Sequence, residues 1–199
     1  MKTCLALVLS AVVAATALVS TQSKTVRVRV QTELGDFVLE VDPVKAPNTT
    51  ANFLKYVDGG HYDGGVFHRT VKMDNQPEST VKIEVIQAGV NPARAKEGFP
   101  AIALERTSVT TLRHGDGTLS MARGGPDSAT DQFFITIGPQ PDLDFGGRRN
   151  RDGQGFAAFG RVTSGMEVVR AIQSGAATGQ SLTVPVTIVR IIRWPAVAR

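Results

Sequence analysis

The chain has 199 residues, of which 42% are hydrophobic and 20% are charged, and its formal net charge is +4. These values are typical of one globular domain with a short appendage. The 20 Gly and 10 Pro exceed what an all-helical protein would tolerate. They separate short runs rich in Val, Ile, Phe and Thr, and this pattern favours a β-rich fold.

The first segment has the features of a secretory signal. Lys2 gives a short positive start, residues 4–19 form a mostly apolar run, and small residues follow. We therefore interpret residues 1–21 as a signal peptide and residues 22–199 as a domain that is exported to a periplasm or secreted. The alternative is an uncleaved membrane anchor, but the apolar run is short for a span of ~20 residues. After cleavage we expect no stable membrane insertion.

Cysteine content and charge distribution restrict the chemistry. Cys4, the single cysteine, lies in the signal segment, so the mature domain would have neither a disulfide nor a cysteine-based metal site. The pI of about 9.5 suggests nucleic acid, yet Lys and Arg are spread along the chain apart from Arg148, Arg149 and Arg151. Because glycines flank that cluster, we interpret it as a solvated loop, and we expect no nucleic-acid partner.

Hydrophobic periodicity predicts a chain of short strands with two helices. The expected strands are residues 26–30, 37–41, 66–71, 81–87, 119–122, 132–138, 156–162 and 187–194. A first helix is expected through residues 52–57 with Asn48 or Thr49 as its N-cap, and a second over residues 165–174. Many short strands with few helices favour a closed antiparallel barrel, because closure removes exposed sheet edges. Periodicity alone names no function.

Four segments, in order and in spacing, resemble the cyclophilin family of peptidyl-prolyl cis/trans isomerases. They are Phe67-His68-Arg69, Ile86-Gln87-Ala88-Gly89, Leu119–Arg123 with Pro126–Ile135, and Phe159–Val169. The resemblance covers roughly residues 26 to 194. It implies a mainly β fold, a closed eight-stranded antiparallel barrel capped by two helices, with a shallow groove for a proline-containing peptide. It also implies a domain without cofactor or metal, and we expect a monomer.

The resemblance makes Arg69 the catalytic residue. An X-Pro bond isomerises slowly because amide resonance sets a barrier of ~18–20 kcal/mol. A guanidinium aimed at the prolyl nitrogen can donate a hydrogen bond to the lone pair as it leaves conjugation. This contact is stronger in the twisted transition state than in the planar ground states. The alternative interpretation of Arg69 is an exposed strand arginine in an ion pair.

The resemblance also assigns substrate binding to Gln87, Ala122, Arg123, Phe134, Leu143 and Phe156. Gln87 matches the glutamine that holds the substrate backbone and steadies the arginine. Ala122 and the backbone of Arg123 match the groove edge that pairs with an extended peptide. Phe134 matches the floor of the proline pocket and Leu143 its aliphatic wall. Phe156 stands where bacterial members often have an aromatic residue.

One segment departs from the family pattern. Residues 72–82 look like an insertion, and Glu84 and Val85 stand where the family usually has a Phe-Met pair. Half of the usual apolar pocket is therefore missing or rebuilt, and Met73 and Pro77 are candidates to replace it. A wall without large apolar side chains would cost about 1.5–3 kcal/mol of binding for each one lost.

Two functions remain open from the sequence. The first is an isomerase that accelerates the folding of exported proteins, for which proline isomerisation can be slow. The second is a catalytically weak cyclophilin-fold module or holdase that binds peptides. Arg69, Gln87 and Phe134 favour the first, whereas Glu84 and Val85 favour the second. A hydrolase has little support, because the sequence has no Gly-x-Ser-x-Gly or His-Glu-x-x-His motif.

Overall fold

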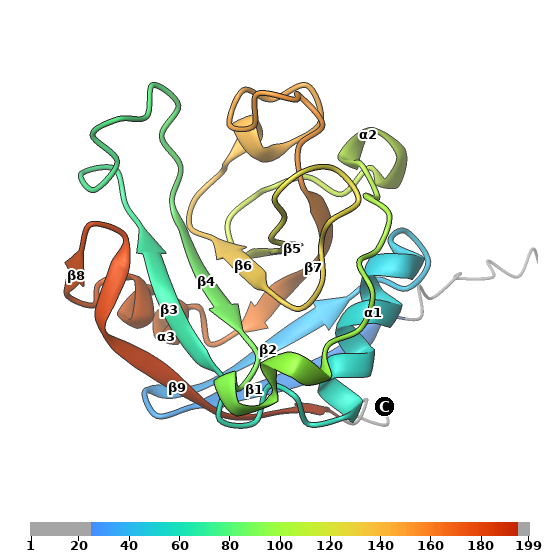
Figure 1. Cartoon of the computed structure of the whole chain (residues 1–199), viewed down its shortest axis with the longest axis vertical. Coiled ribbons are helices and arrows are strands. Elements are labelled where there is room, and N and C mark those ends of the chain that lie inside the picture. Colours follow the sequence, from blue (N-terminus) through green and yellow to red (C-terminus); the bar gives the residue numbers. More distant parts are fainter. Residues whose placement is uncertain (1–24, 195–199) are drawn as a thin grey trace, which may run out of the picture.

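Residues 25–194 are described by a computed structural model, in which antiparallel strands form a closed barrel (Figure 1). The strands are β1 (Val26–Thr32), β2 (Gly35–Val41), β3 (Val66–Val71), β4 (Val85–Gly89), β5 (Thr118–Met121), β6 (Phe133–Thr136), β7 (Ala157–Ser164), β8 (Ala177–Thr178) and β9 (Ser181–Arg193). The sheet order is β1-β2-β7-β5-β6-β4-β3-β9-β8, and an additional β1–β9 pairing closes it. Because β8 is a two-residue arm paired with β9, the barrel itself has eight strands, as predicted.

The barrel interior is filled by alternate residues of its strands. Val28 and Val30 of β1 and Phe37 and Leu39 of β2 are fully buried, while their neighbours in sequence are partly exposed. This period of two is the pattern of a sheet with one face toward the core. The predicted signal peptide, residues 1–21, lies outside the described residues. No helix within residues 25–194 is long and apolar enough to cross a membrane.

Two longer helices accompany the barrel, as predicted. The helical segments are α1 (Pro47–Asp58), η1 (Pro92–Glu97), α2 (Thr107–Thr110), η2 (Pro141–Leu143) and α3 (Met166–Gln173). The predicted N-cap of the first helix is wrong, because α1 already begins at Pro47, whose fixed φ suits the first helical turn. The N–H groups of Asn48 and Thr49 donate instead to the Glu105 carboxylate at 3.0 and 2.8 Å. A distant side chain thus provides the cap.

An irregularity in β3 sets the direction of Arg69. Phe67 pairs with Ala88 and Arg69 pairs with Gln87, so two steps along β3 match one step along β4 and His68 is the extra residue. Phe67 and Ala88 are fully buried in the core, whereas Arg69 and Gln87 are partly exposed. Residues two apart in a regular strand share a face. The bulge therefore turns Arg69 to the outer face of the barrel.

The insertion between β3 and β4, residues 72–82, extends this hairpin beyond the barrel, above the β8–β9 turn in Figure 1. Gln76 is buried and joins the two ends of the insertion. Its Nε2 donates to the carbonyl oxygens of Lys72 and Ile83, each at 2.8 Å. The strand predicted at 81–87 is displaced by this structure, because β4 spans Val85–Gly89. The insertion is a structured extension of the hairpin.

Candidate active site

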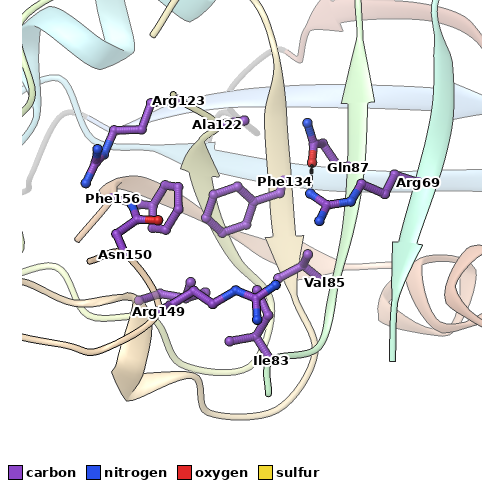
Figure 2. A pocket seen from close by; sticks show the side chains of 11 residues that line it. Arg69, Ile83, Val85, Gln87, Ala122, Arg123, Phe134, Arg149, Asn150 and Phe156 are labelled. Carbon is purple, nitrogen blue, oxygen red and sulfur yellow. Dashed lines mark hydrogen bonds between the residues drawn. The ribbon is translucent and has the colours of Figure 1, made fainter. Parts of the chain in front are cut away.

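All the predicted site residues line one pocket of about 260 Å³ on the outer face of the barrel (Figure 2). The lining residues are Arg69, Ile83, Val85, Gln87, Ala122, Arg123, Phe134, Leu143, Arg149, Asn150 and Phe156. The catalytic and substrate-binding residues expected from the sequence are therefore brought together. Ile83, Arg149 and Asn150 were missed, and Val85 was expected only as a sign of a missing wall.

The pocket is built on one row of paired residues that crosses three neighbouring strands. Arg69 on β3 pairs with Gln87 on β4, and Gln87 pairs with Phe134 on β6. Adjacent strands lie about 4.8 Å apart, so two steps of the row place Arg69 and Phe134 about 10 Å apart at the backbone. Both side chains line the same hollow, and Figure 2 shows the guanidinium of Arg69 reaching toward the strand that carries the Phe134 ring.

Two glutamines hold the guanidinium of Arg69. Nη1 donates to Gln87 Oε1 at 2.7 Å, Nε donates to Gln180 Oε1 at 3.0 Å, and Nη2 donates to the same Gln180 oxygen. Gln87 Nε2 in turn donates to Gln132 Oε1 at 2.7 Å. Burial, and then the nearby charge of Arg149, lower the pKa of Arg69. Both acceptors are neutral amides. Within the part of the chain that the structure covers, Arg69 is therefore not held by an ion pair, and the alternative interpretation of Arg69 is wrong.

The apolar part of the pocket is a small core outside the barrel. Phe134 and Leu143 are buried there with Val85, and Phe156 packs against them. The rings of Phe134 and Phe156 meet edge to face, with centroids 5.2 Å apart. The backbone N–H of Phe156 donates to the carbonyl of Leu143 at 2.9 Å. This hydrogen bond fixes the aromatic ring beside the aliphatic wall.

The wall that the sequence left open is rebuilt by Ile83 and Val85. Both are buried in the same cluster as Phe134. Glu84 lies between them and points away, where its carboxylate accepts a hydrogen bond from Gln173 at 3.2 Å. The expectation that Met73 or Pro77 would replace the wall is wrong, because neither lines the pocket. Ile83 lies two residues before Val85, the first residue of β4. The alternation of the strand continues to it, so the side chains of Ile83 and Val85 point to the same face and both line the pocket.

Arg123 is locked at the far edge of the pocket. Its Nη1 and Nη2 donate to the two carboxylate oxygens of Asp152 at 2.7 and 3.0 Å, and its Nε donates to the carbonyl of Gly155 at 2.7 Å. The guanidinium lies 5.2 Å from the ring centre of Phe156. The hydrogen bonds from Arg123 to the carboxylate, and then the backbone N–H of Gln154, lower the pKa of Asp152 to about 2. The side chain of Arg123 therefore ties this edge of the pocket to the loop that carries Asp152 and Gly155.

Arg149 corrects the interpretation of the basic cluster as a solvated loop. Arg148 fits it, with 78% of its side chain exposed. Arg149, however, is partly buried, and its Nη1 donates to Ser79 Oγ and to the carbonyl of Val81, both at 2.7 Å. It joins the 141–155 loop to the insertion across the pocket. The flanking sequence carries no signal of this contact.

A Ser-His-Asp chain lies behind Phe134 but is not a hydrolytic site. His114 Nε2 is 2.9 Å from Ser120 Oγ, and His114 Nδ1 is 2.8 Å from Asp144 Oδ1. All three residues are buried, and the imidazole stacks under the Phe134 ring. A nucleophile needs access to its substrate, so we assign this chain a supporting role beneath the pocket floor. Within residues 25–194, no cluster of three His, Cys, Asp or Glu side chains is arranged to hold a metal.

Comparison with known proteins identifies the family. The family described as "Cyclophilin type peptidyl-prolyl cis-trans isomerase/CLD" matches residues 27–193. The chain belongs to the cyclophilin family. Among curated cyclophilins it is 37% identical over 155 residues to peptidyl-prolyl cis-trans isomerase cyp18 of Streptomyces antibioticus, covering 77% of this chain and 86% of that one. It is 35% identical over 151 residues to peptidyl-prolyl cis-trans isomerase B of Escherichia coli, covering 75% and 85%.

Solved structures agree on the fold of this cyclophilin. The crystal structure of a cyclophilin type isomerase from Cryptosporidium parvum superposes with a TM-score of 0.69 at 23% identity, covering 86% of this chain and 99% of that one. The same protein crystallised in the presence of the dipeptide Ala-Pro gives a TM-score of 0.68. The family match and the curated relatives make the chain a peptidyl-prolyl cis-trans isomerase.

Proposed function

We propose that this cyclophilin accelerates X-Pro isomerisation in proline-containing segments of exported proteins, with Arg69 stabilising the twisted amide. The observation that carries the proposal is the arrangement of the pocket, in which a half-buried guanidinium faces the aromatic floor formed by Phe134. The exported context rests on the signal-like sequence of residues 1–21. Proline-containing substrates are also supported by the Cryptosporidium relative crystallised with Ala-Pro.

Arg69 would act by a hydrogen bond that strengthens during rotation. A guanidinium has five N–H donors, and Gln87 and Gln180 accept three of them among the described residues. The remaining N–H groups can reach a prolyl nitrogen above Phe134. As the amide twists, its lone pair leaves conjugation and becomes a better acceptor. Every 1.36 kcal/mol of such differential stabilisation would give about a tenfold rate increase.

The remaining site residues would hold the peptide in this position. The proline ring would pack on Phe134 against Leu143 and the rebuilt wall. Gln87 would bind the substrate backbone, since it lies between the guanidinium and a second hollow of about 280 Å³. Ala122 and Arg123 line both hollows. An extended peptide would therefore continue from the proline pocket past these two residues.

The test of the Arg69 role is a protease-coupled isomerisation assay with a proline peptide. We expect Arg69→Ala to lower kcat/KM by at least about tenfold, because the variant loses a hydrogen bond made mainly in the transition state. Arg148→Ala is the matched control and should retain the wild-type rate, since this arginine is exposed and lies outside the pocket. Equal rates for the wild type and Arg69→Ala would contradict the proposed role.

The exported context has its own test. We expect the protein expressed in a native-like bacterial host to be recovered from the periplasm or medium with an N-terminus near residue 22, because residues 1–21 would be removed on export. N-terminal sequencing or intact mass measures this directly. Recovery of the full-length chain from the cytosol alone would overturn export without affecting the Arg69 mechanism.

A further inference from the structure

Gln180 holds Arg69 from the side opposite Gln87, although it lies outside the pocket lining. It stands at the turn between β8 and β9, and its Oε1 accepts from both Nε and Nη2 of the guanidinium. Gln87 on β4 accepts from Nη1 at 2.7 Å. Gln87 binds a single terminal nitrogen, so with Gln87 alone the guanidinium could still turn about the Cδ–Nε bond, whereas the contacts of Gln180 to Nε and Nη2 fix its plane. The remaining N–H groups consequently keep one direction, toward the pocket.

The turn that carries Gln180 is itself anchored to β3 and to the insertion. The backbone N–H of Thr70 donates to the carbonyl of Gln180 at 2.9 Å. Asn75 Nδ2 donates to the carbonyls of Thr70 and Gly179, each at 3.0 Å, and Asn75 Oδ1 accepts from the N–H of Lys72 at 2.7 Å. Asn75 therefore ties the insertion to the β8–β9 turn. The position of Gln180 beside Arg69 depends on these contacts.

The neutrality of the acceptor matters for the chemistry. A carboxylate at this place would orient the guanidinium equally well, but it would also offset the positive charge that faces the substrate. Both acceptors of Arg69 within residues 25–194 are amide oxygens. The charge thus stays available in a partly desolvated site, where fixed charges and dipoles act most strongly on a transition state.

We propose that Gln180 is a positioning residue that fixes the plane of the Arg69 guanidinium, with Asn75 holding the turn that presents it. The proposal rests on the proposed catalytic role of Arg69. It also gives the insertion a role in catalysis, because Asn75 of the insertion holds the turn from which Gln180 contacts Arg69. Gln180 acts through Arg69 and makes no contact with the substrate.

The test is a double-mutant cycle between Arg69→Ala and Gln180→Ala, read as kcat/KM in the coupled assay and as peptide Kd by NMR titration. We expect Gln180→Ala to lower kcat/KM about tenfold, since small displacements of a catalytic group cost rate, while Kd changes less than about twofold. In the Arg69→Ala background, Gln180→Ala should have no further effect. Gln173→Ala is the matched control, because Gln173 contacts Glu84 and not Arg69.

The outcomes separate this inference from the proposed function. If Arg69→Ala leaves the rate unchanged, the proposed function fails. If Arg69→Ala lowers the rate but Gln180→Ala does not, or if Gln180→Ala costs the same factor in both backgrounds, only the inference fails. Thermal unfolding checks that each variant folds. If Gln180→Ala does not fold, Asn75→Ala replaces it in the cycle. A loss of kcat/KM in Asn75→Ala that is equally large in the Arg69→Ala background would also overturn the inference.

Discussion

At the scale of single residues, Arg69 carries its charge in a half-buried position where neutral partners orient it. Burial is the largest cause of its lowered pKa, and the neighbouring charge of Arg149 adds to it. A guanidinium nevertheless stays protonated at any pH at which the protein works. The ionisable residues that line the pocket are all arginines. The proposed catalysis by Arg69 therefore involves no proton transfer by a pocket residue.

Arg149 gives a residue-scale prediction. Its hydrogen bonds to Ser79 and Val81 involve a charged donor, so Arg149→Ala should weaken docking of the insertion by about 1.5–3 kcal/mol. We expect amide hydrogen exchange in residues 72–82 to become about 10- to 100-fold faster, because local opening follows this free energy. Mass spectrometry measures the exchange, and Arg148→Ala serves as the control. Unchanged exchange in Arg149→Ala would contradict the docking role.

At the scale of elements, the direction of Arg69 could not be predicted from periodicity. Phe67 and Arg69 are two residues apart, so a regular strand would place both on the core face. The β3 bulge at His68 separates them, and a bulge depends on pairing with another strand. The Phe-His-Arg motif identified Arg69 as a site residue, whereas periodicity would have placed it on the core face. The wall residue Ile83 was missed because the insertion shifts the start of β4.

Ile83 gives the element-scale prediction. Ile83 is 6% exposed in the cluster under the pocket, whereas Met73 in the neighbouring insertion is 52% exposed. We expect Ile83→Ala to lower the free energy of unfolding by about 2–4 kcal/mol, because it leaves a cavity. It should also weaken peptide binding, since the variant loses part of the wall. Met73→Ala should stay within about 0.5 kcal/mol of the wild type. Denaturant unfolding and peptide titration measure both, and equal effects of the two variants would contradict the wall assignment.

At the scale of the whole molecule, the closed barrel and its two longer helices could be predicted, as could seven of the eleven residues that line the pocket. Short alternating strands and the order of four motifs carried that information. The supports of the site, Gln180 and Arg149, and the α1 cap formed by Glu105 could not be predicted, because these side chains act on partners far away in the sequence. Their side chains carry no local pattern that distinguishes them from surface residues. Only the folded chain brings these partners together.

Acid stability gives the whole-molecule prediction. The hydrogen bonds from Arg123, and then the one from the backbone N–H of Gln154, lower the pKa of Asp152 from 3.8 to about 2 in the folded protein. Because the folded pKa lies below the unfolded one, the stabilisation is complete above pH 3.8 and is lost as the pH falls through about 2. An NMR titration of the Asp152 carboxyl should have its midpoint near the lower value. A midpoint at the ordinary value would mean that the Arg123 clamp is absent in solution.

The most direct test of the central claim is two-dimensional NMR exchange spectroscopy on an Ala-Pro-containing peptide with a catalytic amount of the protein. Uncatalysed isomerisation takes tens to hundreds of seconds, so cis–trans exchange peaks on a sub-second mixing time report catalysis alone. We predict strong exchange peaks with the wild type, and peptide binding without exchange peaks with Arg69→Ala. Binding without exchange by the folded wild type would contradict the account and leave the chain as a peptide-binding module.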